Sequence, residues 1–229
     1  HAHLGFRHDG QDGYEVVVHC ASNRAKAEKT RKLIEENDGI AAAVTGDLTD
    51  PCTAERLMAE NGPLDALVLD ASMQIRRPWQ KISLEEYQKQ MTCNFYSSLR
   101  LIQLAVPHMK AQKWGRIVTI GSVQERKPHP DMLVYSASKA AQTNMAQSLA
   151  QQLAADGITV NNVAPGVIFT DRNVEALSDP TYAAEVTASI PAGFYGEPRD
   201  CTGVVRLLLS DAARYITGQS IYVDGGKSL

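Results

Sequence analysis

The chain has 229 residues, of which 44% are hydrophobic and 21% are charged, a balance typical of a soluble globular protein with one large core. The net charge of −3, from 23 basic and 26 acidic residues, provides no global positive field to attract nucleic acid or an anionic membrane. No apolar run approaches the roughly 20 residues that cross a bilayer, and the N-terminus lacks the pattern of a secretory signal. We therefore expect one cytoplasmic domain over residues 1–229 that works on small molecules, with no nucleic acid and no membrane partner.

Short apolar runs alternate with longer amphipathic stretches along the chain. The predicted strands are 14–20, 40–48, 64–72, 115–123, 158–165 and 216–226, and the predicted helices are 24–37, 52–61, 83–113, 136–156 and 198–210. Several of these strands are apolar at consecutive positions, which is typical of parallel strands covered on both faces. This order predicts an α/β fold with a doubly wound, mostly parallel, Rossmann-like sheet in three layers. The loop-like stretch 166–197 contains glycines and prolines and is the candidate substrate lid.

The cysteines and histidines show no metal-ligand spacing. Cys20, Cys52, Cys93 and Cys201 lie far apart and form no CxxC pair, and the six histidines are likewise scattered. We therefore expect reduced thiols and no metal site.

Polar side chains gather near the end of the predicted strand 115–123. Ser122 lies at this end, and "YSASK" places Tyr135 and Lys139 four residues apart on one helix face. Ligands of such sheets bind beyond the carboxyl ends of the strands. A phenol has an ordinary pKa of about 10, which a neighbouring ammonium lowers. Tyr135 therefore suits a general acid or base, Ser122 suits an anchor for a substrate oxygen, and the Asn94 amide is placed to order a water beside the lysine.

Ser122 followed by Tyr135-x-x-x-Lys139 resembles the active site of the short-chain dehydrogenase/reductase family. Asn94, the "NNVAPG" run with Thr170, and the closing "ITGQSIYVDGG" also match that family in order and spacing, so the likeness covers about residues 14–226. It implies hydride transfer between a nicotinamide cofactor and an alcohol or ketone, with the protein supplying position and proton.

The resemblance also implies a role for each residue. Tyr135 would donate or accept the proton, Ser122 would orient the carbonyl, Lys139 would tune the tyrosine and grip the nicotinamide ribose, and Asn94 would support the relay. The family implies a homodimer or homotetramer. A serine hydrolase is disfavoured, because Ser122 does not lie in a GxSxG turn with an accompanying His and Asp.

The N-terminus departs from the family pattern. Members begin with a strand, a TGxxxGxG turn and a helix, but only fourteen residues precede Glu15, and Gly5, Gly10 and Gly13 do not fit that spacing. No strand is predicted there, so we expect the N-terminal strand and phosphate loop to be missing or remodelled. Either part of this segment is not in the sequence, or the chain is a variant whose cofactor cleft is remodelled. In the second case, impaired cofactor binding would favour a binding or scaffold protein.

A second departure is "LDAS" at 69–72, where the family carries NNAG. Ser72 adds a side chain at a close approach to the cofactor, and the carboxylate of Asp70 could repel phosphate.

The strand end "HCASNR" favours NADP over NAD. Cys20 stands where an NAD-binding strand carries an acid, and the side chains that follow offer a hydroxyl, an amide and a guanidinium to a 2′-phosphate. With the positions carried over from the family, the predicted cofactor-binding residues are Ser22, Asn23, Arg24, Asp47, Leu48, Ala71, Tyr135, Lys139, Pro165, Gly166 and Thr170.

Basic residues flank the predicted site. "QIRRPW" and "QERKPH" contribute Arg76, Arg77, Arg126 and Lys127, which either attract an acidic substrate or only keep the surface soluble. "QIRRP" resembles the gluconate 5-dehydrogenase branch of the family, and the overall pattern resembles 3-oxoacyl carrier-protein reductases equally well. The predicted partner is a small-molecule carbonyl or alcohol.

Overall fold

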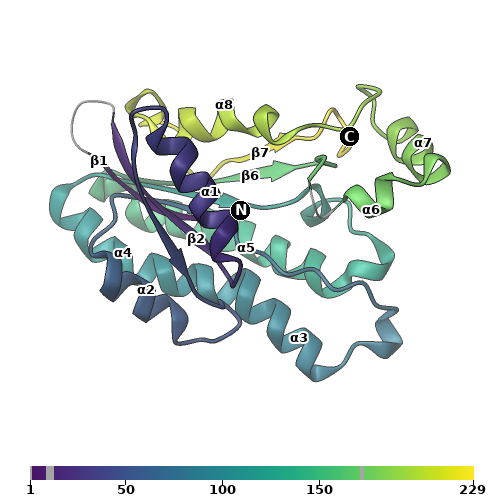
Figure 1. Ribbon diagram of the computed structural model, residues 1–229, viewed down its shortest axis with the longest axis horizontal. Coiled ribbons are helices and arrows are strands. Elements are labelled where there is room, and N and C mark those ends of the chain that lie inside the picture. The colour runs from purple at the N-terminus through teal and green to yellow at the C-terminus, as the bar shows by residue number, and fades with distance from the viewer. Residues whose placement is uncertain (1, 9–12, 171–172) are drawn as a thin grey trace.

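The computed structural model describes residues 2–8, 13–170 and 173–229, and these form a seven-stranded sheet (Figure 1). Its strand order is β3-β2-β1-β4-β5-β6-β7. The strands are β1 (Ala2–His8), β2 (Tyr14–Cys20), β3 (Ile40–Thr45), β4 (Ala66–Leu69), β5 (Gly115–Ile120), β6 (Ile158–Pro165) and β7 (Ser220–Val223). β2 and β3 pair in parallel, as do β4 to β7, which confirms the predicted mostly parallel α/β sheet.

Helices cover both faces of the sheet and make three layers. They are α1 (Arg24–Glu35), α2 (Thr53–Asn61), α3 (Leu84–Met91), α4 (Ser97–Gln112), α5 (Leu133–Leu153), α6 (Val174–Leu177), α7 (Pro180–Ala188) and α8 (Pro198–Leu209). Figure 1 shows α2, α4 and α5 below the sheet and α8 above it. Each face of the sheet buries its own apolar cluster: Leu101 and Met145 belong to the lower cluster, and Leu208 belongs to the upper one.

The central strands are buried along their length. All four residues of β4 and the first seven of β6 are buried, as consecutive apolar runs predict for strands with helices on both faces. Parallel pairing brings the carboxyl ends of β4, β5 and β6 to one edge, where the polar residues that follow them meet.

The first strand is the main departure from the predicted fold. β1 lies between β2 and β4 and runs antiparallel to both, so the prediction of no strand before residue 14 is wrong. Its sequence, AHLGFRH, does alternate apolar residues with others, which is a strand signal. Five residues separate His8 from Tyr14, of which 9–12 lie outside the described residues. A crossover helix needs ten or more residues, so β1 and β2 form a hairpin and not a βαβ unit.

Two predicted segments differ in detail. The helix predicted over 83–113 is interrupted by a π-helix at Thr92–Tyr96, which separates α3 from α4. The stretch 166–197 is less loop-like than expected, because it contains α6 and α7; its residues 171 and 172 lie outside the described ones. Within the described part of the chain, none of the helices combines the length and apolarity needed to span a membrane.

Candidate active site

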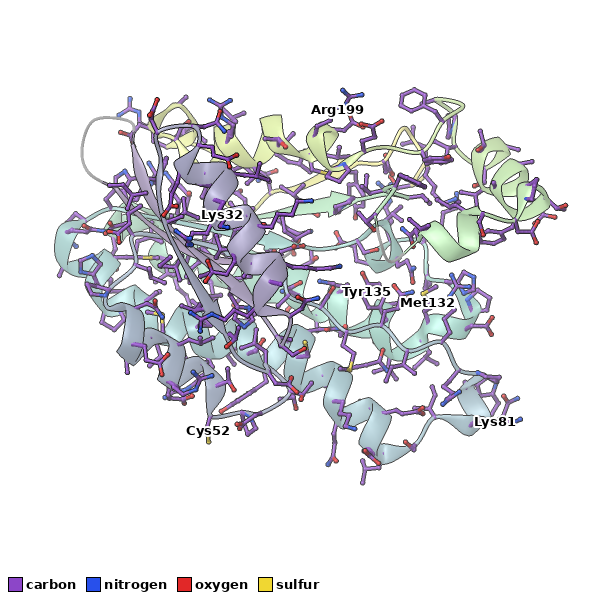
Figure 2. All side chains as sticks on the ribbon, in the orientation of Figure 1. Lys32, Cys52, Lys81, Met132, Tyr135 and Arg199 are labelled. Carbon is purple, nitrogen blue, oxygen red and sulfur yellow. The ribbon has the colours of Figure 1, made fainter. Side chains whose placement is uncertain are left out.

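Ser122, Tyr135 and Lys139 line one cavity at the carboxyl end of the sheet. Ser122 follows β5, while Tyr135 and Lys139 lie one turn apart at the start of α5. Their exposed fractions are 8%, 6% and 1%, and the Lys139 Nζ lies 5.9 Å from the centre of the Tyr135 ring. Figure 2 shows Tyr135 in the middle of the molecule, whereas Cys52, Lys81 and Arg199 lie at its periphery. Three of the four predicted catalytic side chains therefore lie together at one buried place.

The ammonium of Lys139 is buried but has oxygen partners. Its Nζ donates to the backbone oxygen of Ile120 at 2.7 Å and to Oε1 of Gln142 at 3.2 Å. Burial disfavours a charged amine, and neutral acceptors offset that cost without cancelling the charge. The positive field of Lys139 is therefore retained beside the Tyr135 ring.

Asn94 lies in the π-helix and is completely buried. Its Oδ1 accepts from the backbone N of Met73 at 2.6 Å, and its Nδ2 donates to the backbone oxygen of Met73 and to Oγ of Ser138, both at 2.9 Å. An amide has two N–H donors, so both are already engaged. The side chain fixes the segment after β4 to α5 and does not line the cavity, unlike the water-ordering amide expected from the sequence.

Ser122 is held by a hydrogen-bonded turn. Its Oγ accepts from the backbone N of Gln124 at 3.2 Å, and the Glu125 carboxylate accepts from the backbone N of Ser122 at 3.5 Å, a capping box. Glu125 also accepts from Thr143 at 2.7 Å and from Asn162 at 3.1 and 3.2 Å. These contacts fix the turn that presents the serine hydroxyl.

The strand β7 completes this network. Ser220 Oγ and Tyr222 OH donate to the Glu125 carboxylate at 2.7 and 3.1 Å. Burial and the negative charge of Glu125 raise the pKa of Tyr222, which therefore stays protonated as a donor. Gly121 must lack a side chain, because a Cβ there would lie 2.5 Å from Oε2 of Glu125. Sequence patterns missed Glu125, since its partners lie up to 97 residues away.

The cavity has a volume of about 1560 Å³ and extends along the carboxyl edge of the sheet from β2 to β6. Of the predicted cofactor-binding residues, those that line it are Ser22, Asn23, Asp47, Leu48, Ala71, Tyr135, Lys139, Pro165, Gly166 and Thr170. Asp47 and Leu48 follow β3, and Pro165 ends β6, so residues distant in sequence converge on one elongated hollow.

Arg24 is the predicted cofactor residue that does not line the cavity. It is 70% exposed and lies 3.5 Å from the carboxylate of Glu28 on the same helix. Asn23 caps α1 by accepting from the backbone N of Lys26 at 3.2 Å, and Lys26 itself lines the cavity. Lys26 is not among the predicted cofactor-binding residues, although it follows Asn23 by only three positions.

The flanking basic residues divide into two groups. Arg76 and Lys127 line the cavity, whereas Arg77 pairs with Glu86 at 2.7 Å and Arg126 stacks over the Tyr222 ring at 5.7 Å. Among the described residues no group of three or more metal-ligating side chains gathers. Of these four basic residues, Arg76 and Lys127 are the two that place positive charge on the cavity wall.

The cavity fits the two ends of a nicotinamide dinucleotide better than its middle. Lys139 offers a buried ammonium at one end, and Ser22 and Leu48 lie at the other. A pyrophosphate is usually bound by a turn and helix N-terminus after the first strand, but β1 continues through a hairpin into β2. The residues that would hold a cofactor here are those that follow β2, β3, β4 and β6, together with Lys139.

The chain is similar to known oxidoreductases. A family model described as enoyl-(acyl carrier protein) reductase matches residues 8–228. 3β-Hydroxysteroid dehydrogenase 1 of Eggerthella lenta is 34% identical over 228 residues, which cover 97% of this chain and 87% of that protein. A 3-oxoacyl (acyl-carrier-protein) reductase of Agrobacterium tumefaciens C58, solved with NADP bound, aligns with a TM-score of 0.86 and 32% identity over 92% of this chain and 83% of that chain.

A second solved structure extends the comparison. The Beutenbergia cavernae protein described as an NAD(P)-dependent gluconate 5-dehydrogenase, with NADP bound, has a TM-score of 0.83 and 35% identity, and the match covers 87% of this chain and 81% of that one. The fold, the buried Ser122, Tyr135 and Lys139, and these similarities show that the chain belongs to the short-chain dehydrogenase/reductase family of oxidoreductases.

Proposed function

We propose that this chain is an NADP-dependent oxidoreductase that interconverts a ketone and a secondary alcohol by hydride transfer. The observation that carries the proposal is the buried ammonium of Lys139 beside Tyr135 and Ser122 in one cavity. A bound nicotinamide would supply or accept the hydride. The residues of the chain would position the substrate and move the proton.

Tyr135 is the group proposed to exchange a proton with the substrate oxygen. Its phenolic oxygen would give up the proton during reduction and take it back during oxidation, while the charge of Lys139 stabilises the phenolate. Ser122 would donate a hydrogen bond to the same substrate oxygen and so hold the reacting carbon in position. Burial of all three side chains excludes water and strengthens these interactions.

Two observations support NADP as the cofactor. The similar proteins of A. tumefaciens and B. cavernae were solved with NADP bound. The end of β2 carries Cys20 where an acid would grip an NAD ribose, and Ser22, Asn23 and Lys26 line the cavity after it. A hydroxyl, an amide and an ammonium can together bind a 2′-phosphate.

The decisive experiment replaces the proposed proton donor. Tyr135→Phe should lower turnover at least about a hundredfold and leave the NADPH dissociation constant within about twofold, because only the proton-transfer group is lost. Turnover is followed by NADPH absorbance over a panel that includes gluconate, a 3β-hydroxysteroid and a 3-oxoacyl thioester, with calorimetry for binding. Tyr215→Phe, at a 99% exposed position, is the matched control. Undiminished turnover of Tyr135→Phe would refute the mechanism.

The hairpin between β1 and β2 favours one alternative, a binding or scaffold protein with impaired cofactor binding. That protein would unfold at the same temperature with and without NADPH. The proposed enzyme would instead be stabilised by about 2.7 kcal/mol at a hundredfold excess of NADPH over its dissociation constant. A thermal unfolding scan with NADPH and NADH separates the two functions.

The lining and the long helices also suggest a substrate class and an assembly. Arg76 and Lys127 line the cavity and favour a substrate with an acidic group. We propose that the protein acts on this substrate in the cytoplasm.

We propose residues 166–197, with α6 and α7, as the substrate lid of a single-domain chain. The long helices α4 and α5 offer outer faces for a homodimer or homotetramer, which light scattering after size exclusion would test.

A further inference from the structure

Gln142 is a buried polar side chain that the proposed mechanism does not yet use. It lies on α5, three residues after Lys139, and its exposed fraction is 0%. A buried amide destabilises a protein unless its donors and acceptor are paired. The partners of Gln142 therefore indicate why an amide occupies this position.

The Gln142 amide joins Lys139 to the π-helix segment. Nζ of Lys139 donates to Oε1 of Gln142 at 3.2 Å, and Nε2 of Gln142 donates to Oγ of Ser98 at 2.9 Å. Oγ of Ser98 donates in turn to the backbone oxygen of Asn94 at 3.3 Å. An ammonium only donates, so the amide must present its oxygen to Lys139 and its N–H to Ser98. The chain of hydrogen bonds runs in one direction, from Lys139 to the Asn94 carbonyl.

This direction matters for the charge beside Tyr135. Ile120 and Gln142 supply two neutral oxygens from two different elements, which together fix the position of the Lys139 ammonium. A carboxylate in place of the Gln142 amide would accept the same hydrogen bond but would cancel the positive field at the Tyr135 ring. An apolar side chain would leave one of the ammonium donors without this acceptor.

We propose that Gln142 is a positioning residue that holds the Lys139 ammonium beside Tyr135 and links it to the Asn94 carbonyl of the π-helix. This inference rests on the proposed roles of Tyr135 and Lys139. It assigns to Gln142 and Ser98 the connection between lysine and π-helix that the Asn94 side chain does not make, because the Asn94 amide is engaged by Met73 and Ser138.

The test is an ultraviolet titration of the Tyr135 phenolate in the free protein, obtained by subtracting the titration of Tyr135→Phe. Gln142→Met removes the acceptor with little change in volume, and Gln142→Glu keeps the acceptor but adds a negative charge. Both should move the midpoint to higher pH by about one unit, because both weaken the positive field at the phenolate. Gln147→Met, at an exposed position of the same helix, should leave it unchanged.

The methionine variant separates positioning from packing, because it removes the acceptor of Lys139 without adding a charge. A merely structural Gln142 would leave the phenolate midpoint unchanged in Gln142→Met, so an unchanged midpoint in that variant would overturn the inference. If Gln142→Met does not fold, Ser98→Ala replaces it, and a smaller shift in the same direction is expected because the amide loses its anchor. The titration needs neither cofactor nor substrate, so it remains interpretable even if Tyr135→Phe keeps its turnover and the proposed function fails.

Discussion

The carboxyl ends of β5 and β2 open into the same cavity, but the structure builds them differently. After β5, Ser122 is buried and its turn is fixed by side chains from α5, β6 and β7 through Glu125. After β2, Ser22 and Asn23 are exposed, and the neighbouring strand β1 runs in the reverse direction. The end proposed for proton transfer is thus preorganised, whereas the end proposed for the dinucleotide presents solvated side chains. The two proposed roles therefore belong to separate parts of the chain.

The largest expected effect is the loss of turnover when Lys139 is replaced at the preorganised end. Lys139→Met should reduce turnover about a hundredfold or more, because the phenolate of Tyr135 loses the adjacent positive charge. NADPH absorbance with the substrate panel measures this loss. Lys110→Met, which removes an exposed lysine that pairs with Asp156, is the control. If Lys139→Met keeps more than about a tenth of the turnover of the unsubstituted protein, Lys139 does not have the proposed role.

The second prediction concerns the stability of the same end. Glu125→Leu should lower the free energy of unfolding by about 2–4 kcal/mol, since it leaves two half-buried hydroxyl donors of α5 and β7 and a buried amide donor of β6 without this acceptor. Urea unfolding measures the change, with Glu36→Gln at an exposed position as the control. A loss below about 0.5 kcal/mol would show that the network is not what fixes the Ser122 turn.

The third prediction uses pH to probe the end of β2. His19 is 2% exposed, and burial is the main reason why its pKa is lowered; Nε2 pairs with the Gly46 oxygen at 2.7 Å. The unfolded chain takes up a proton below about pH 6.5, but folded His19 does not. Stability should therefore fall as the pH drops below that value, by up to about 1.4 kcal/mol per pH unit.

His19→Gln should remove this part of the pH dependence. Urea unfolding of both proteins between pH 7.5 and about pH 5.5 gives the difference, which cancels the other titrating groups. Identical pH dependence in the two proteins would mean that His19 takes up its proton at the same pH in the folded and unfolded chains, so that burial does not lower its pKa.

The smallest expected effect is on NADPH affinity, and it compares Lys26 with Arg24 at the end of the cavity after β2. Lys26→Ala should weaken NADPH binding roughly three- to fivefold, because it removes one exposed charge from the cavity wall. Arg24→Ala should change the affinity less than twofold, since Arg24 lies against Glu28 and off the wall. Calorimetry with NADPH and NADH measures both variants. A larger loss of NADPH affinity in Arg24→Ala than in Lys26→Ala would show that Arg24 contributes to cofactor binding.

Local patterns in the sequence predicted the strands of the parallel sheet and the pairing of Tyr135 with Lys139 on α5. Tyr135 and Lys139 are four residues apart in one helix, so their proximity follows from helix geometry alone. Met145 and Leu153 lie eight residues apart on α5, a helical spacing that places both on the face packed into the lower cluster. Gly157, just after this helix, has a left-handed φ of 75°, which glycine adopts most readily.

The features that the sequence did not predict depend on distant partners. The direction of β1 is set by its pairing with β2 and β4, which a seven-residue alternation does not specify. Glu125 and Ser220 are 95 residues apart, and Gln142 and Ser98 are 44 apart, so neither pair forms a motif. The π-helix changes the backbone hydrogen bonds over five residues, too few to alter the apolar period of residues 83–113.

The π-helix at Thr92–Tyr96 also determines which changes in length α3 can tolerate. It accommodates one residue more per turn than an α-helix, and each residue of a helix turns the following face by about 100°. Deleting one residue from Thr92–Tyr96 would therefore restore regular winding with little rotation of α3 against α4, whereas deleting one residue within α3 would rotate its preceding part by about 100°. That part of α3 is adjacent to Gln90, which accepts from the Ile75 backbone N at 3.1 Å and ties α3 to the segment after β4. Substitutions within α3 are therefore expected to be far better tolerated than any change in its length.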